Sequence, residues 1–183
     1  MSVYVMMAVA GAIGLIWKIK MADMVAKSAA PIGAAFTLLA LVTGAIWGKP
    51  TWGTWWVWDA RLTSMLVMLF LYIGIISLQA SFDSAKSAGK SSAVLAIVGL
   101  VNLPIIKYSV DWWNTLHQSA SFTVSDKPAM PPEMFLPLIV MIFGYYFLFA
   151  TLLMMITRCE ILEREVRSRW VARVLLNRPL KKN

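Results

Sequence analysis

Five of the nine tryptophans in this 183-residue chain fall between residues 47 and 63, in a segment that also contains glycine and proline. Trp offers a large, flat contact surface with little rotamer entropy to lose, and its indole N–H can orient a polar group. Gly48 and Gly53 allow close backbone approach, and Pro50 is expected to stiffen the loop. An aromatic belt at a membrane interface explains one or two rings at a helix end, not five. The spacing therefore predicts a flat, rigid aromatic platform.

Asp59 and Arg61 stand where the next apolar run begins. An acid is favoured at a helix N-terminus, so a helix cap is one interpretation of Asp59. The helix dipole disfavours Arg61 at that position, and a carboxylate of a partner or ligand would stabilise it. The segment thus suits a planar, amphipathic, acidic molecule. Its candidate binding residues are Trp52, Trp55, Trp56, Trp58, Asp59 and Arg61.

The only histidine, His117, lies in a second polar and aromatic segment, residues 107–133, shortly after Trp112 and Trp113. A lone histidine is usually structural, but its aromatic neighbours make this one a candidate metal ligand. A haem fits both segments, because it is planar, has an apolar body and two propionates, and accepts a neutral imidazole as axial ligand. Zinc does not fit, because it needs three or four His, Cys or acidic ligands. Met130 is a weaker candidate for a second iron ligand.

The composition shows what kind of structure must position these residues. The chain is 60% hydrophobic and 14% charged, with a mean hydropathy of +0.70, whereas soluble domains are about 45–50% apolar and about 25% charged. The apolar excess falls in long uncharged runs, which excludes an ordinary cytosolic globule and a disordered chain. The single cysteine, Cys159, allows no internal disulfide and no covalent haem attachment through a Cys-x-x-Cys-His motif. The sequence therefore predicts a membrane protein.

Five apolar stretches are long enough, or nearly so, to cross a bilayer as helices. Loops and open strands are inadmissible in lipid, so the expected fold class is all-α, a polytopic transmembrane helix bundle. Pro31 is expected in the first turn of the second span, and Asn102 and Pro104 should kink the outer end of the fourth. The predicted spans are 1–17, 28–47, 62–80, 91–106 and 135–157.

Lysine and arginine orient these spans. Of the 17 Lys and Arg residues, 13 lie on the side of the C-terminal tail and four on the other. By the positive-inside rule the tail is cytoplasmic, and the segments 48–61 and 107–133 face outward. The charge is then a topology signal rather than evidence for a nucleic-acid partner. Polar and aromatic residues are expected to cluster in those two outward segments alone, and the span interiors hold no ionisable residue.

The chain is expected to divide into a transmembrane domain, residues 1–157, and a basic cytoplasmic tail, residues 158–183. Apolar residues recur in the tail at helical spacing between charges, which predicts an amphipathic helix on anionic membrane lipid. A helix that docks on a partner is the alternative. Five spans with the tail inside place Met1 outside, directly in an apolar run without the features of a signal peptide. We therefore expect an upstream span to be missing.

One pattern resembles a known family. The run Trp52-Gly53-x-Trp55-Trp56-x-Trp58-Asp59-x-Arg61-Leu62-Thr63 resembles the WWD signature of membrane proteins that handle haem for cytochrome c maturation. Further segments narrow the resemblance to the haem exporter protein C family over residues 1 to about 175; the longer haem lyases share the signature but are less similar in the flanks. These further segments are 30–33, 41–44, 47–50, 102–106 and 111–118.

The resemblance implies six spans, a WWD loop outside the bacterial inner membrane, and two external histidines as axial ligands of one haem b, bound transiently and without a covalent bond. It implies as partners an ABC-type permease, its ATPase, and a membrane-anchored haem chaperone that receives the haem. His117 matches the second histidine. The first would lie before the helix that opens this chain, in agreement with a missing span.

The leading hypothesis is accordingly a haem-binding handover protein that is not an enzyme. A permease subunit is the first alternative, although intramembrane ionisable residues usually mark such a path. A membrane haem lyase is the second, with Asp59 as base. General-base chemistry needs another positioned group, for which Asp111 and His117 are available outside. A lyase would also need a sizeable external domain to bind an apocytochrome.

Overall fold

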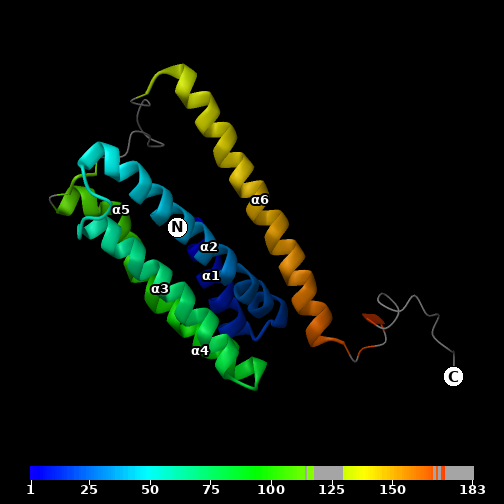
Figure 1. Cartoon of the computed structure of the whole chain (residues 1–183). Helices are drawn as coiled ribbons and strands as arrows, with labels where there is room; N and C mark the ends of the chain where they lie inside the picture. Colours follow the sequence, from blue (N-terminus) through cyan, green and yellow to red (C-terminus); the bar gives the residue numbers. More distant parts are fainter. Residues whose placement is uncertain (114, 118–129, 167, 169, 172–183) are drawn as a thin grey trace, which may run out of the picture.

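The computed structural model describes residues 1–113, 115–117, 130–166, 168, 170 and 171. Within these ranges the chain is helical between short connections, without a strand. Figure 1 shows α1 to α5 gathered into one bundle, with α6 inclined to it, and the main contacts of α6 are with α2. The elements are α1 (Ser2–Trp17), α2 (Lys20–Trp52), α3 (Ala60–Ser81), α4 (Ala85–Val98), the 3₁₀ turn η1 (Gly99–Val101), α5 (Asn102–Trp112) and α6 (Pro132–Arg164).

Four helical stretches of the described chain are long and apolar enough to cross a membrane. They are α2, α3, the continuous stretch from α4 through α5, and α6; α1 is equally apolar but has 16 residues. The predicted all-α polytopic bundle is confirmed, and the chain is a multi-pass membrane protein. The third span was predicted within two residues of the bounds of α3, because Asp59 caps a run without charges.

The second span is longer than predicted at both ends. α2 begins at Lys20 rather than 28, and it is separated from α1 only by Lys18, in the left-handed conformation with φ 55°, and Ile19. Pro31 therefore lies inside α2 and not in its first turn, and Pro50 lies in the last turns of α2 and not in a loop. Both expectations were wrong, because lipid favours the paired backbone of a continued helix over an open loop, even where proline removes one N–H.

The fourth span departs from a regular α-helix near its outer end, as expected. The backbone tightens to a 3₁₀ turn at η1 immediately before Asn102. The Asn102 side chain donates a hydrogen bond of 2.8 Å to the carbonyl of Ser64 on α3, and Pro104 lacks an N–H. The helix thus departs from regular α geometry close to the Asn102 side-chain bond to α3 and to Pro104, which lacks a backbone donor.

The fifth span begins as expected, with Pro131 as N-cap and Pro132 as the first helical residue, but α6 continues to Arg164. The prediction that a separate tail helix starts at Arg158 is wrong for residues 158–164. Glu160 and Arg164 pair with side chains of α2, which prolongs the helix past its apolar part. The part of the predicted amphipathic helix after residue 171 lies outside the described residues.

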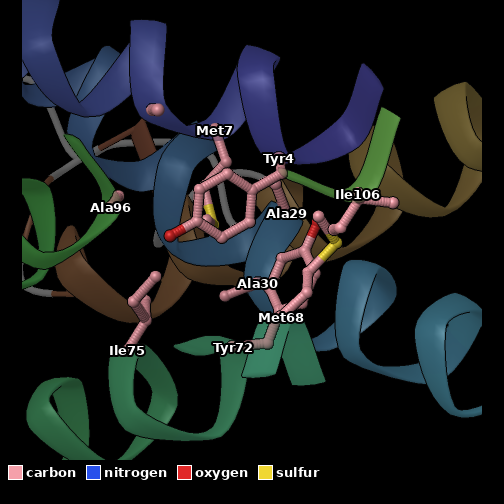
Figure 2. Packing of buried hydrophobic residues seen from close by; sticks show 10 residues of the cluster. Tyr4, Met7, Ala29, Ala30, Met68, Tyr72, Ile75, Ala96 and Ile106 are labelled. Carbon is pink, nitrogen blue, oxygen red and sulfur yellow. The ribbon is translucent and has the colours of Figure 1, made fainter. Parts of the chain in front are cut away.

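Two tyrosines occupy the centre of the bundle. Tyr4 of α1 and Tyr72 of α3 meet edge to face, with ring centroids 5.2 Å apart, and both are fully buried. Small residues around them let the helices approach closely, as is common in membranes. Figure 2 shows the cluster, which also contains Met7, Ala29, Ala30, Met68, Ile75, Ala96 and Ile106.

Gly33 of α2 provides a test of this packing. A Cβ atom built there would overlap the Tyr72 ring. We expect Gly33→Ala to lower the stability of the detergent-solubilised chain by about 1–3 kcal/mol, the usual cost of overpacking. Gly44→Ala is the matched control on α2, where the added Cβ meets nothing within 4 Å; it should stabilise the chain by about 0.5–1 kcal/mol. Thermal unfolding measures both, and equal effects would contradict the expected steric conflict.

Candidate functional site

The two segments predicted to face outward lie at the same end of the bundle. The loop between α2 and α3 stands beside the C-terminal end of α5 in Figure 1. The Trp52 and His117 ring centroids are 4.7 Å apart, and the Asp59 carboxylate hydrogen-bonds to His117. The predicted proximity of the two segments is confirmed, and together they are one candidate site.

The loop that carries the WWD pattern is short, because α2 continues to Trp52. Only residues 53–59 of the predicted 47–63 segment are outside helices. Gly53 ends α2 in the left-handed conformation, with φ 77°, and donates its N–H to the Lys49 carbonyl. Lys49 Nζ in turn donates a 3.0 Å hydrogen bond to the Gly53 carbonyl and lies 5.9 Å from the Trp55 ring centroid. Contacts with the end of α2 therefore hold the loop in place.

The tryptophan rings are stacked edge to face and do not form one flat surface. Trp47 and Trp52 have an interplanar angle of 84°, and Trp56 and Trp58 one of 76°. The prediction of a single flat platform was wrong in this respect, since edge-to-face pairs are favoured by the ring quadrupoles. Trp55 and Trp58 are 58% and 75% exposed. Within the loop at residues 53–59, these two rings therefore offer surface to a ligand.

Trp56 presents an unusual donor. Its ring is half-buried, and its indole Nε1 is buried with no hydrogen-bond partner in the described part of the chain. A buried N–H without an acceptor costs about 1–3 kcal/mol. An oxygen of a bound molecule would satisfy it, so the loop combines exposed ring surface with an available donor.

Trp112 and Trp113, also predicted to belong to the site, lie at the end of α5 and are 58% and 51% exposed. Trp112 stacks on Tyr108 at 5.4 Å, and Lys107 Nζ lies 5.2 Å from the Tyr108 ring centroid. Among the described residues, the ring contacts of this pair are with each other and with Tyr108, not with His117. They form a second aromatic group at the same end of the molecule.

Asp59 connects the loop to the histidine. Its Oδ1 accepts the Leu62 N–H at 2.8 Å, which caps α3, and its Oδ2 accepts a hydrogen bond from the Thr115 hydroxyl and lies 2.7 Å from His117 Nδ1. Burial alone would raise the pKa of the Asp59 carboxyl, but the hydrogen bonds from Thr115, Leu62 and His117 outweigh it and hold the pKa below the ordinary value. Asp59 is therefore an ionised acceptor at neutral pH.

Sequence reasoning predicted the cap and missed the bond to His117. The two residues are 58 positions apart, and one sequence alone carries no signal for such a contact. Arg61 lies in the first turn of α3 and is half-buried, as expected for its place in the motif. In the described ranges it makes no ion pair, so its guanidinium is available to an acidic ligand.

A second polar cluster, which was not predicted from the sequence, lies where α2 begins and α6 ends. Glu160 bonds to Lys27 at 2.7 Å and to Arg164, and Arg164 also bonds to Asp23 at 2.8 Å. These contacts place residues 18–27 and the start of the tail at one end of the bundle, as predicted from the charges. The expectation that polar residues cluster in the two outward segments alone was wrong, because these charges are spread over two segments that are distant in the sequence and meet only on folding.

Comparisons with known proteins give one consistent answer over nearly the whole chain. A family model described as heme exporter protein C matches residues 1–172. Heme exporter protein C of Escherichia coli (strain K12) is 53% identical over 178 residues, which cover 97% of this chain and 71% of that protein. The Haemophilus influenzae protein of the same name is 50% identical over 171 residues, covering 93% and 70%. A cytochrome c biosynthesis ccmC-like mitochondrial protein of Marchantia polymorpha is 40% identical over 160 residues, covering 87% and 67%.

Proposed function

Because the chain belongs to the haem exporter protein C family, whose members handle haem for cytochrome c maturation, we propose that it binds haem at the end of the bundle where the Trp-rich loop meets His117. Haem is here a cargo that is bound and passed on. The observation that carries the proposal is the chain's one histidine, held by Asp59 against the ring of Trp52, which ends the helix from which the loop with the exposed Trp55 and Trp58 begins.

In this proposal each residue type has one task. His117 supplies an axial ligand to the iron through its ring nitrogen. Trp55 and Trp58 cover part of the apolar face of the macrocycle. Arg61 pairs with a propionate; Lys49, the other cation considered from the sequence, already donates to the Gly53 carbonyl, which favours Arg61. The unpartnered indole N–H of Trp56 is a further donor for a propionate oxygen.

The proposal also covers topology and partners. The haem-binding end faces the periplasm and the tail lies in the cytoplasm of a bacterial inner membrane, in keeping with the excess of Lys and Arg at the opposite end. The chain works beside an ABC-type permease and ATPase and passes haem to a membrane-anchored chaperone. A binding site at the end of the bundle, with exposed rings, is accessible to such a partner.

We further propose that the chain makes and breaks no bond in haem. Asp59, the residue considered as a base, is buried; its oxygens already accept hydrogen bonds from Leu62 and Thr115, and one of them lies 2.7 Å from His117 Nδ1. This arrangement supports a role in holding the histidine over one in accepting a proton from a substrate.

Haem titration of a tryptophan variant tests the site. We expect Trp58→Ala to weaken haem binding by about ten-fold, which corresponds to the roughly 1.4 kcal/mol of one good aromatic contact. Trp17→Ala is the matched control: Trp17 is 65% exposed, much as Trp58 is, but it ends α1 at the opposite end of the bundle. Both variants should keep the helical circular dichroism of the wild type. Equal haem affinity in the Trp58 variant and the wild type would contradict a role of the loop in binding.

A further inference from the structure

The position of one proton on His117 decides whether its imidazole can bind iron. A neutral imidazole has one N–H and one nitrogen with a free lone pair, and only the latter is a ligand. We propose that Asp59 and Thr115 hold the proton of His117 on Nδ1, which leaves Nε2 free to bind haem iron. Asp59 is in this view a positioning residue. The part that concerns iron rests on the proposed function, whereas the proton position is a property of the chain alone.

Hydrogen-bond accounting carries the inference. His117 Nδ1 lies 2.7 Å from Asp59 Oδ2 and 3.2 Å from Thr115 Oγ1. An ionised carboxylate only accepts, and the one hydroxyl hydrogen of Thr115 is donated to Asp59. Both neighbours therefore present lone pairs to Nδ1. A proton on Nδ1 turns these contacts into hydrogen bonds, whereas its absence would bring lone pairs face to face at 2.7 Å.

The same contacts fix the orientation of the ring. The Asp59 side chain is 4% exposed, and its other oxygen caps α3 through the Leu62 N–H, so it cannot turn without breaking the cap. The backbone N–H of His117 donates to Thr115 Oγ1 at 3.1 Å, and Trp52 packs against the imidazole. The N-terminal cap of α3 thus fixes the position of the His117 imidazole.

A carboxylate partner also changes the properties of the ligand. An imidazole whose N–H is donated to a carboxylate is more basic and stabilises the more oxidised metal. We therefore expect haem bound at this site to have a lower midpoint potential than the same haem beside a neutral hydrogen-bond partner.

The proton position can be measured without haem. The chain has one histidine, so ¹⁵N-histidine labelling gives one imidazole in the NMR spectrum of the detergent-solubilised protein. In alkaline buffer, we expect the spectrum of the neutral ring to show a protonated Nδ1 and an unprotonated Nε2. A proton on Nε2 in the wild type would overturn the inference.

Asp59→Asn is the decisive variant. Asparagine is as good an N-cap as aspartate and can keep the bond from Leu62 through its carbonyl oxygen. Its NH₂ group then faces His117 Nδ1, so the proton should move to Nε2, the wrong nitrogen for binding iron. We expect haem binding to weaken by about 10- to 100-fold, as for other partners of metal ligands, and the midpoint potential of any haem that binds to rise. An unchanged proton position, affinity and potential would overturn the inference.

Rescue by free imidazole separates positioning from a structural role. In His117→Gly, added imidazole can bind iron through its unprotonated nitrogen without help from Asp59. It should therefore restore haem binding equally in the presence and absence of Asp59→Asn. Rescue of His117→Gly alone would show that Asp59 merely maintains the loop, and would overturn the inference. A wild type that shows the expected NMR spectrum but binds no haem would overturn the proposed function and leave the proton position established.

Discussion

His117→Ala should remove the axial-ligand signature from the absorption spectrum of the purified chain. The loss in haem affinity should exceed the about 10- to 100-fold expected when a partner of a metal ligand is removed, because here the ligand itself is lost. The variant also leaves the Asp59 carboxylate without one of its donors. Total haem in the purified protein is measured chemically beside the spectrum, so that loss of haem is distinguished from a change of ligand.

A control variant from the same segment makes this result interpretable. Tyr108→Phe removes a hydroxyl from an exposed ring close to Trp112 and keeps the ring itself. We expect its haem content and spectrum to match those of the wild type. If His117→Ala also matches the wild type, His117 is not a ligand. If no chain holds haem, the proposal that this chain binds haem by itself fails.

How far the sequence predicts the fold depends on what ends each helix. The bounds of α3 follow from local rules, because a capping aspartate precedes an uncharged run. The start of α2 and the end of α6 do not, because the charges in those turns are stabilised by each other across the two helices. Sequence patterns mark the limits of the apolar run. At the start of α2 and at the end of α6, these limits differ from the limits of the helix.

In the candidate site, too, some features follow from the sequence and others depend on tertiary packing. Residue types and their order identify Trp55, Trp58 and His117 as candidates, because few other roles require them in that arrangement. The ring orientations depend on tertiary packing, so the edge-to-face arrangement was not predictable from composition. The Asp59–His117 bond connects segments separated by α3, α4, η1 and α5. That Asp59 both caps α3 and contacts His117 therefore became evident only from the structure.

Glu160→Ala should weaken the attachment of the end of α6 to α2. Glu160 is 8% exposed and accepts hydrogen bonds from Lys27 and Arg164. Removal of one partner from a buried ion pair costs about 3–5 kcal/mol because the other charge is left uncompensated. Since the Lys27 side chain is 39% exposed and Arg164 keeps Asp23 as a partner, we expect about 1–3 kcal/mol. Thermal unfolding in detergent measures the loss, and Glu163→Ala, at an exposed position on α6, should change stability little.

A double variant distinguishes charge pairing from packing as the cause. In Lys27→Met combined with Glu160→Met, two apolar side chains replace the paired charges, and such replacement of a buried ion pair is often neutral or stabilising. We expect the double variant to recover most of the stability lost in Glu160→Ala, because Arg164 still binds Asp23. A double variant as unstable as Glu160→Ala would show that α6 is held by the specific charge–charge geometry. Recovery would show that the free energy gained from the Lys27–Glu160 ion pair is nearly equal to the cost of burying its charges. Apolar contact between α2 and α6 would then be sufficient to hold the end of α6.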